Sequence, residues 1–186
     1  EVLTGDWGED STRDRLEGRG GDDVLIGGAN GDELRGGSGN DLLIGGANGT
    51  SGNYWDDQDR ADYWPLTLDD LLVSQVRVAF NYSTSEIVRN SNGNIITAAD
   101  EYDLRAGFEL VNAIEVIDLT GALGTDILIG VELINTAGGQ ITTNLSYEYE
   151  DWDNDSQTDQ VRVRGTDFND IVGGPSATAD VFKALG

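Results

Sequence analysis

The chain has 186 residues, which suits one domain or two small ones with a buried core. Its 11 basic and 35 acidic residues give a formal net charge of −24, which disfavours nucleic acid and anionic membrane surfaces as partners. The absence of Cys and His excludes disulfides, thiol nucleophiles, Ser–His–Asp triads and Cys- or His-based zinc sites within this chain. No apolar run approaches the roughly 20 residues of a membrane span, so we expect no membrane insertion.

The acidic excess has two interpretations: a solvated acidic surface, or carboxylates that hold cations as part of the folded state. A hydrophobic content of 38%, with four Trp and six Tyr, argues against a disordered chain. The spacing of the acids decides between the two interpretations.

The N-terminal part repeats every nine residues between about residues 9 and 49. Three positions stay in phase over four units: Asp14, Asp23, Asp32 and Asp41; Leu16, Leu25, Leu34 and Leu43; Gly18, Gly27, Gly36 and Gly45. Glycine supplies the positive-φ backbone of a tight turn, and aspartate supplies the hard oxygen ligand that Ca²⁺ prefers. The period therefore favours bound cations over a solvated acidic surface.

This pattern resembles the RTX (repeats-in-toxin) nonapeptide G-G-x-G-x-D-x-U-x, in which U is a large aliphatic residue. The resemblance implies a parallel β-roll in which two nonapeptides form one coil, so that turns two units apart share a Ca²⁺ ion. Carried over to this chain, it pairs Asp23 with Asp41 and places Asp32 at the other edge. It also implies that backbone oxygens complete the calcium shell, from Gly18, Gly20, Gly36 and Ser38.

The match has departures that predict a short roll. Arg19 replaces the second Gly of its unit, Asn30 replaces the fourth-position Gly of the next, and Thr50 stands where Asp is expected. We therefore expect about two coils within residues 1–52, followed by a second, β-rich calcium-binding domain over residues 53–186. The two parts form either separate domains or one continuous domain.

The downstream segment also predicts strands, so the fold class is expected to be all-β: a short roll packed on or merged with a β-sandwich-like domain. The expected strands cover residues 76–80, 114–119, 127–129, 131–134, 141–149 and 161–164. A short helix starting near Thr67 is an alternative for residues 68–73, and residues 179–185 are either a helical turn or the start of another unit.

Further calcium ligands are expected in this downstream segment. Single RTX-like units cover residues 121–129, which contain Asp126, and residues 165–172, which contain Asp170. Acids at places 1, 3, 5 and 9 of residues 151–159 match the ligand spacing of an EF-type calcium loop, although Ser156 and Arg162 depart from its pattern. The candidate ligands of this loop are Asp151, Asp153, Asp155 and Asp159.

Aromatic and acidic residues alternate over residues 53–65, directly after the repeats. One interpretation is a cap in which Trp55 or Trp64 seals the open end of the roll. The other is a recognition surface whose aromatic faces and partly coordinated calcium bind a ligand. The candidate ligand-binding residues are Tyr54, Trp55, Asp56, Asp57 and Asp59, with Trp152 from the later acidic loop.

The resemblance implies a secreted, extracellular protein that folds on meeting calcium after type I export. Our leading hypothesis is a non-enzymatic, calcium-dependent ligand-binding module of an RTX adhesin at the bacterial cell surface. Its expected partner is a peptide or protein, or else a glycan, on a host or neighbouring cell. We expect a monomeric module of a longer chain. The alternatives are a calcium-rigidified spacer and the non-catalytic calcium-binding tail of an RTX enzyme.

Overall fold

The computed structural model describes residues 1–5, 13–47, 58–97, 99, 104–143, 146–150, 160–164 and 181–183. The all-β prediction is confirmed, because the only helix among the described residues is one 3₁₀ turn, η1 (Leu68–Asp70). No helix in the described ranges is long and apolar enough to cross a membrane.

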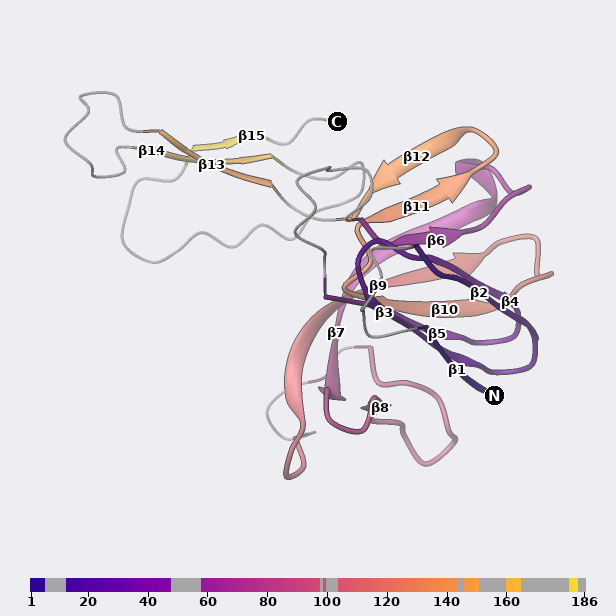
Figure 1. Ribbon diagram of the computed structural model, residues 1–186. Coiled ribbons are helices and arrows are strands. Elements are labelled where there is room, and N and C mark those ends of the chain that lie inside the picture. Colours follow the sequence, from indigo (N-terminus) through magenta and orange to yellow (C-terminus); the bar gives the residue numbers. More distant parts are fainter. Residues whose placement is uncertain are drawn as a thin grey trace.

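The strands form three sheets (Figure 1). The first sheet, called sheet A here, has the order β1 (Val2–Thr4), β3 (Val24–Ala29), β5 (Leu42–Ala47), β10 (Thr125–Ile129), β9 (Glu109–Asp118), β7 (Leu71–Asn81) and β8 (Glu86–Ile87). Sheet B has the order β12 (Gly139–Thr142), β11 (Leu133–Thr136), β6 (Arg60–Asp62), β4 (Glu33–Ser38) and β2 (Arg15–Gly20). The third contains β13 (Ser146–Glu150), β14 (Gln160–Arg164) and β15 (Val181–Lys183).

Sheets A and B are the two walls of a parallel β-roll, because the chain alternates between them at each short strand. Strands β1, β3, β5 and β10 pair in parallel in sheet A, and β2, β4, β6 and β11 do so in sheet B. The roll is therefore longer than the two coils expected within residues 1–52. Strands on both sides of residue 52 share both sheets, as in the alternative of one continuous domain.

The interior of the roll is a ladder of aliphatic side chains. Each ladder residue follows an acidic residue by two positions: Leu16, Leu25, Leu34, Leu43, Ala61, Leu128 and Ile134. All of them are buried in one core cluster. Because side chains alternate along a strand, this position points inward from every coil.

Antiparallel strands close the C-terminal end of the roll. β9 pairs antiparallel with β10 in sheet A, and β12 pairs antiparallel with β11 in sheet B. Ile114 and Val116 from β9 and Ile141 from β12 join the interior core. The expected cap by Trp64 is wrong, since this side chain is 57% exposed. Trp55 lies outside the described residues.

The outer faces of the two walls differ. In sheet A, outward residues such as Leu42, Ile44 and Ile127 pack with Val78 and Phe80 of β7, so this face is buried as well. In sheet B the outward residues of β2, β4 and β6 are charged and remain partly or fully exposed. Sheet B is thus the wall of the roll that presents side chains to solvent.

The remaining strand predictions are largely correct. Residues 76–80 and 114–118 lie in β7 and β9, and 161–164 lie in β14. The strand expected over residues 141–149 is divided between β12 and β13, and 181–183 form a strand rather than a helical turn. Near Thr67 only one 3₁₀ turn forms, because β7 begins at Leu71 and continues the pairing with β9.

Candidate metal centre

Acidic side chains stack in two columns, one along each edge of the roll. In the first column the Asp23 N–H donates to Asp41 Oδ1 at 2.9 Å, and the Asp41 N–H donates to Asp126 Oδ1 at 3.0 Å. The amino group of Glu1 lies 2.8 Å from Asp23 Oδ1 and continues this column. One oxygen of each carboxylate thus ties its coil to the neighbouring coil.

The second column follows the same rule at the opposite edge. The Asp14 N–H donates to Asp32 Oδ1 at 2.8 Å, and the Asp32 N–H donates to Asp59 Oδ1 at 2.8 Å. The Asp59 N–H then donates to Glu132 Oε2 at 2.9 Å. The structure therefore places Asp23 with Asp41 and Asp32 at the other edge, as the resemblance implies.

The second carboxylate oxygens point into the turns. Oδ2 of Asp23, Asp41 and Asp59 is buried and accepts no hydrogen bond within the described residues. A buried carboxylate oxygen without a donor or a cation carries a large desolvation cost. These atoms are therefore suited to a hard cation.

Glycines leave space for such a cation. A Cβ added to Gly18 would lie 2.7 Å from Asp23 Oδ2 and 2.6 Å from the Gly36 carbonyl oxygen. At the other edge, a Cβ on Gly27 would lie 2.5 Å from Asp32 Oδ2 and 2.6 Å from the Gly45 oxygen. Each turn therefore aims one carboxylate and one carbonyl of the next coil at the same small volume.

These donors fit Ca²⁺, which takes six to eight oxygens from carboxylates and backbone carbonyls. No three acidic side chains gather in a single cluster among the described residues, so each ion would depend on carbonyl oxygens as well as on aspartate. Of the predicted carbonyl donors, Gly18 and Gly36 lie at these cradles. Gly20 and Ser38 pair across β2 and β4, and the Ser38 oxygen accepts the Gly21 N–H at 2.8 Å.

Asp126 differs from the other members of its column. Its Oδ2 accepts a hydrogen bond of 2.8 Å from the hydroxyl of Tyr63, a buried side chain of the interior core cluster. Before Asp126, the carboxylate of Asp118 accepts N–H groups of Thr120, Ala122 and Leu123 and holds the turn that leads to β10. Both carboxylate oxygens of Asp126 therefore accept hydrogen bonds within the protein.

Burial shifts the ionisation of the columns in the calcium-free protein. Desolvation is the main cause that raises the pKa of Asp59 to about 8, and the charges of Glu132 and Asp32 add to it. Desolvation likewise raises the pKa of Asp126 to about 7, and it raises the pKa of Asp41. At these three positions, burial therefore makes the charged carboxylate less favourable than it is in water.

Calcium-free protein is expected to become more stable as the pH falls from 8 to 5. The pKa of Asp59 is about 8 in the folded state and 3.8 in the unfolded state. Its contribution to the free energy of unfolding is therefore complete below pH 3.8 and is lost as the pH rises through about 8. Thermal melting at several pH values, in excess EGTA with a stabilising osmolyte such as sucrose that restores a cooperative transition, measures this effect. Asp59→Asn should flatten the profile, whereas Asp69→Asn, at an exposed acid, should leave it steep; equal profiles would contradict the assignment to Asp59.

Several predicted residues fall outside the described residues or outside the columns. Tyr54, Trp55, Asp56, Asp57, Asp151, Trp152, Asp153, Asp155, Asp159 and Asp170 lie outside the described residues. Asp59 was expected to contact a ligand, but it is fully buried in the second column.

Asp59 and Glu132 are the column members that the nine-residue period misses. Their signal is an acid two positions before an inward residue, as in Asp59–Ala61 and Glu132–Ile134.

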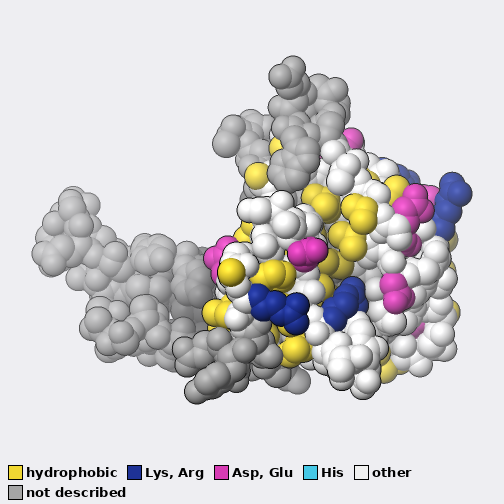
Figure 2. Space-filling view, turned by 90° about the horizontal axis from the view of Figure 1, so that it is seen from below, with side chains coloured by type: hydrophobic (Ala, Val, Ile, Leu, Met, Phe, Trp, Pro, Cys, Tyr) yellow, Lys and Arg dark blue, Asp and Glu magenta, His cyan; other side chains and the backbone are white. Residues whose placement is uncertain are grey.

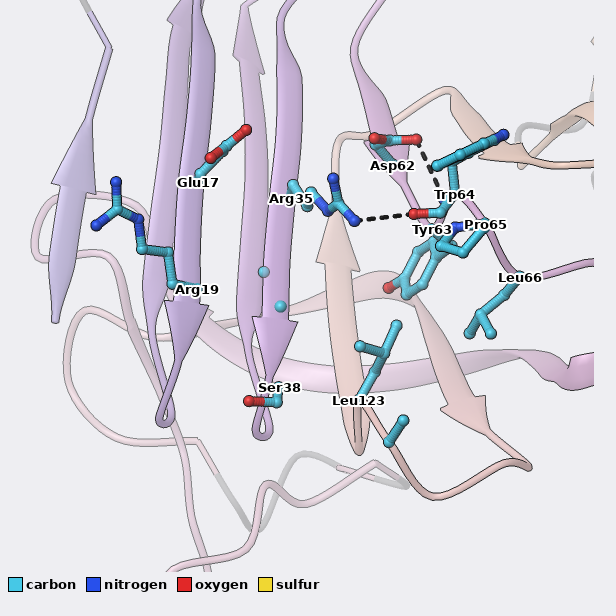
Figure 3. A pocket seen from close by; sticks show the side chains of 13 residues that line it. Glu17, Arg19, Arg35, Ser38, Asp62, Tyr63, Trp64, Pro65, Leu66 and Leu123 are labelled. Carbon is cyan, nitrogen blue, oxygen red and sulfur yellow. Dashed lines mark hydrogen bonds between the residues drawn. The ribbon is translucent and has the colours of Figure 1, made fainter.

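A pocket of about 480 Å³ opens on the outer face of sheet B (Figure 3). Its floor is the bare backbone of Gly36 and Gly37, and Arg19 and Arg35 stand beside it. The segment after β6 forms the opposite wall, where Arg35 donates a 2.9 Å hydrogen bond to the Trp64 carbonyl. The remaining lining residues include Leu66 and Leu123.

The columns and the interior ladder define a calcium-binding β-roll. Comparison with known families matches residues 10–43 and 26–48 to the RTX calcium-binding nonapeptide repeat, whose family description covers four copies. Residues 10–48 are therefore RTX repeats, and the resemblance seen in the sequence is confirmed. RTX repeats bind several Ca²⁺ ions and are typical of secreted, extracellular proteins. Comparisons with curated proteins and with solved structures gave no match.

Proposed function

We propose that the chain is a calcium-dependent ligand-binding module of a secreted RTX adhesin, which attaches a bacterial cell to a peptide or protein on a host or neighbouring cell. Calcium holds the coils of the roll together, and the rigid roll presents its outer surface to the ligand. The proposed module binds without catalysing a reaction, and it acts as one monomeric part of a longer chain.

The pocket on sheet B is the observation that supports this proposal. A spacer or an enzyme tail needs calcium sites and a closed core, but it needs no concave site with an exposed aromatic side chain. Trp64 is 57% exposed beside this pocket, and exposed tryptophan and arginine side chains are typical of binding hot spots. On the face drawn in Figure 2, apolar side chains form patches, whereas acidic side chains are scattered singly.

A peptide array and a glycan array, probed with the labelled chain in calcium and in EGTA, test this function. We expect calcium-dependent binding to peptides and a loss of about tenfold in affinity for Trp64→Ser, since hot-spot aromatic side chains contribute on this scale. Leu119→Ser is a matched control, because Leu119 is 60% exposed and does not line the pocket. A calcium-loaded chain that binds neither array would overturn the proposal in favour of a spacer or tail.

A further inference from the structure

The exposed face of sheet B carries charges in a regular alternation. In the first row across the strands, Arg15 pairs with Glu33 and Glu33 pairs with Arg60. The Arg15 guanidinium lies 3.3 Å from a carboxylate oxygen of Glu17 and 3.5 Å from a carboxylate oxygen of Glu33, so these two acids balance its charge. The charges in this row run positive, negative, positive.

The second row has the opposite order. Glu17 pairs with Arg35 across β2 and β4, and continuing this register brings Asp62 beside Arg35 (Figure 3). The charges therefore run negative, positive, negative. Opposite charges on neighbouring strands stabilise a sheet face, and each cation here has an acid as its neighbour.

The third row stops after its first charge. Arg19 pairs with Gly37, where the alternation of the first two rows would place an acidic side chain. Gly37 cannot supply one, because its φ is +105° and a Cβ there would collide with the Arg19 carbonyl oxygen. This place without an acidic side chain, called the gap below, lies over the pocket floor, and both Arg19 and Arg35 line the same pocket.

Arg19 is available to a ligand at this gap. Its exposed side chain has no hydrogen bond or ion pair within the described part of the chain. It also replaces a repeat glycine and adopts a φ of 74°, a left-handed conformation that costs energy for a residue with a side chain. The Arg19 guanidinium is therefore free to pair with an anionic group of a ligand.

Apolar side chains line the part of the pocket away from Arg19. Trp64, Pro65 and Leu66 form one wall, and Leu123 lies at the end near Ser38 (Figure 3). These side chains suit an apolar group bonded close to the anion. Glu17 and Asp62 on either side of Arg35 would repel a polyanion, so the pocket favours one isolated carboxylate over a phosphate chain or a polyuronate.

We propose that this pocket binds a peptide segment with a single acidic residue, whose Glu or Asp carboxylate lies over Gly37 and whose neighbouring apolar side chain packs against Trp64 and Leu123. The carboxylate fills the missing place in the charge alternation. Arg35 lies beside it, hydrogen-bonded to the Trp64 carbonyl, and the exposed Arg19 side chain, which points away from Gly37 in Figure 3, turns toward the carboxylate on binding. This inference rests on the proposed function and names its ligand class and site. It requires no calcium ligand to be shared with the peptide.

NMR titration of the calcium-loaded chain tests the proposal. The probes are acetylated and amidated pentapeptides Gly-X-Glu-X-Gly, with X as Leu or Phe, together with twins that carry Gln in place of Glu. The Gly37 amide and the Trp64 indole report on the pocket. Arg19→Gly is the decisive variant, because it restores the repeat residue and suits the left-handed backbone; Arg105→Gly, at an exposed turn outside the pocket, is its control.

We expect the Glu peptides to shift both reporter signals, and binding to weaken about tenfold in the Gln twins and in Arg19→Gly. Arg105→Gly should bind as the parent chain does. If the chain binds peptides with equal affinity in Arg19→Gly, the site is wrong but the proposed function stands. If an oligouronate binds at these reporters and the peptides do not, the ligand class is wrong. If the chain binds neither these probes nor any array ligand, the proposed function fails as well.

Discussion

Excess EGTA is expected to unfold the roll. The two columns stack buried carboxylates of successive coils, because the backbone N–H of one aspartate donates to the carboxylate of the next, as from Asp23 to Asp41 or from Asp32 to Asp59. Their Oδ2 atoms point into the turns, where Asp23, Asp41 and Asp59 find no donor among the described residues. Without calcium these charges repel one another and are poorly solvated, and the glycine-rich turns regain their conformational entropy.

The expected loss is comparable with the whole stability of a domain. An ion present at 100 times its dissociation constant stabilises the folded state by about 2.7 kcal/mol. Several such ions together contribute on the order of 10 kcal/mol, and domains of this size have net stabilities of about 5–15 kcal/mol. Removing calcium therefore leaves little or no net stability.

Circular dichroism and size-exclusion chromatography in calcium and in EGTA measure this effect. We expect EGTA to abolish the cooperative thermal transition and to increase the hydrodynamic radius, and calcium to restore both. Magnesium in place of calcium is the control, because it demands a smaller octahedral shell and gives up its water reluctantly. A chain that stays equally compact and heat-resistant in EGTA would refute calcium as the element that holds the coils together.

The nine-residue period predicts the roll correctly only where the turns have a constant length. More residues separate Gly45 from Asp59 than separate Gly27 from Asp32, so Asp59 falls out of phase although it occupies the same place in its coil as Asp32. The turn between Gly130 and Glu132 is shorter and replaces Asp with Glu. Because turns lie at the surface, they accept insertions without disturbing the inward ladder. The spacing between acid and inward residue is therefore a better guide than the period.

The closure of the roll and the exposed face of sheet B both depend on pairing between strands that lie far apart in the sequence. Leu42–Ile44 and Ile127–Ile129 are continuous apolar runs, which is typical of strands buried on both faces. The sequence does not show that β9 lies between β10 and β7 in sheet A, because the pairing of β9 with β7 joins residues far apart in the chain, such as Asp118 and Leu71. The charge alternation on sheet B also depends on register, since its neighbours come from β2, β4 and β6.

Asp23→Asn together with Asp41→Asn is expected to destabilise the chain only when calcium is present. Asparagine keeps an Oδ1 acceptor for the Asp23 N–H that the Asp41 carboxylate now accepts at 2.9 Å. It removes two of the three buried carboxylates at this edge, so the calcium-loaded fold loses the ion that Asp23 and Asp41 hold. The loss of one ion of about 2.7 kcal/mol lowers the melting temperature by roughly 5–10 °C in a chain of this length.

In EGTA, with enough of a stabilising osmolyte such as sucrose to restore a cooperative transition, the same double variant should melt at the same temperature as the parent chain or higher. The neutral amides remove a charge repulsion that calcium no longer offsets, while the hydrogen bonds between coils remain. Asp69→Asn with Glu109→Gln is the matched control, because it removes the same charge from two exposed positions. Melting curves and calcium stoichiometry of both variants test the geometry. An equal loss of stability with and without calcium would mean that Asp23 and Asp41 support the coil through hydrogen bonds alone, which would contradict a shared ion at this edge.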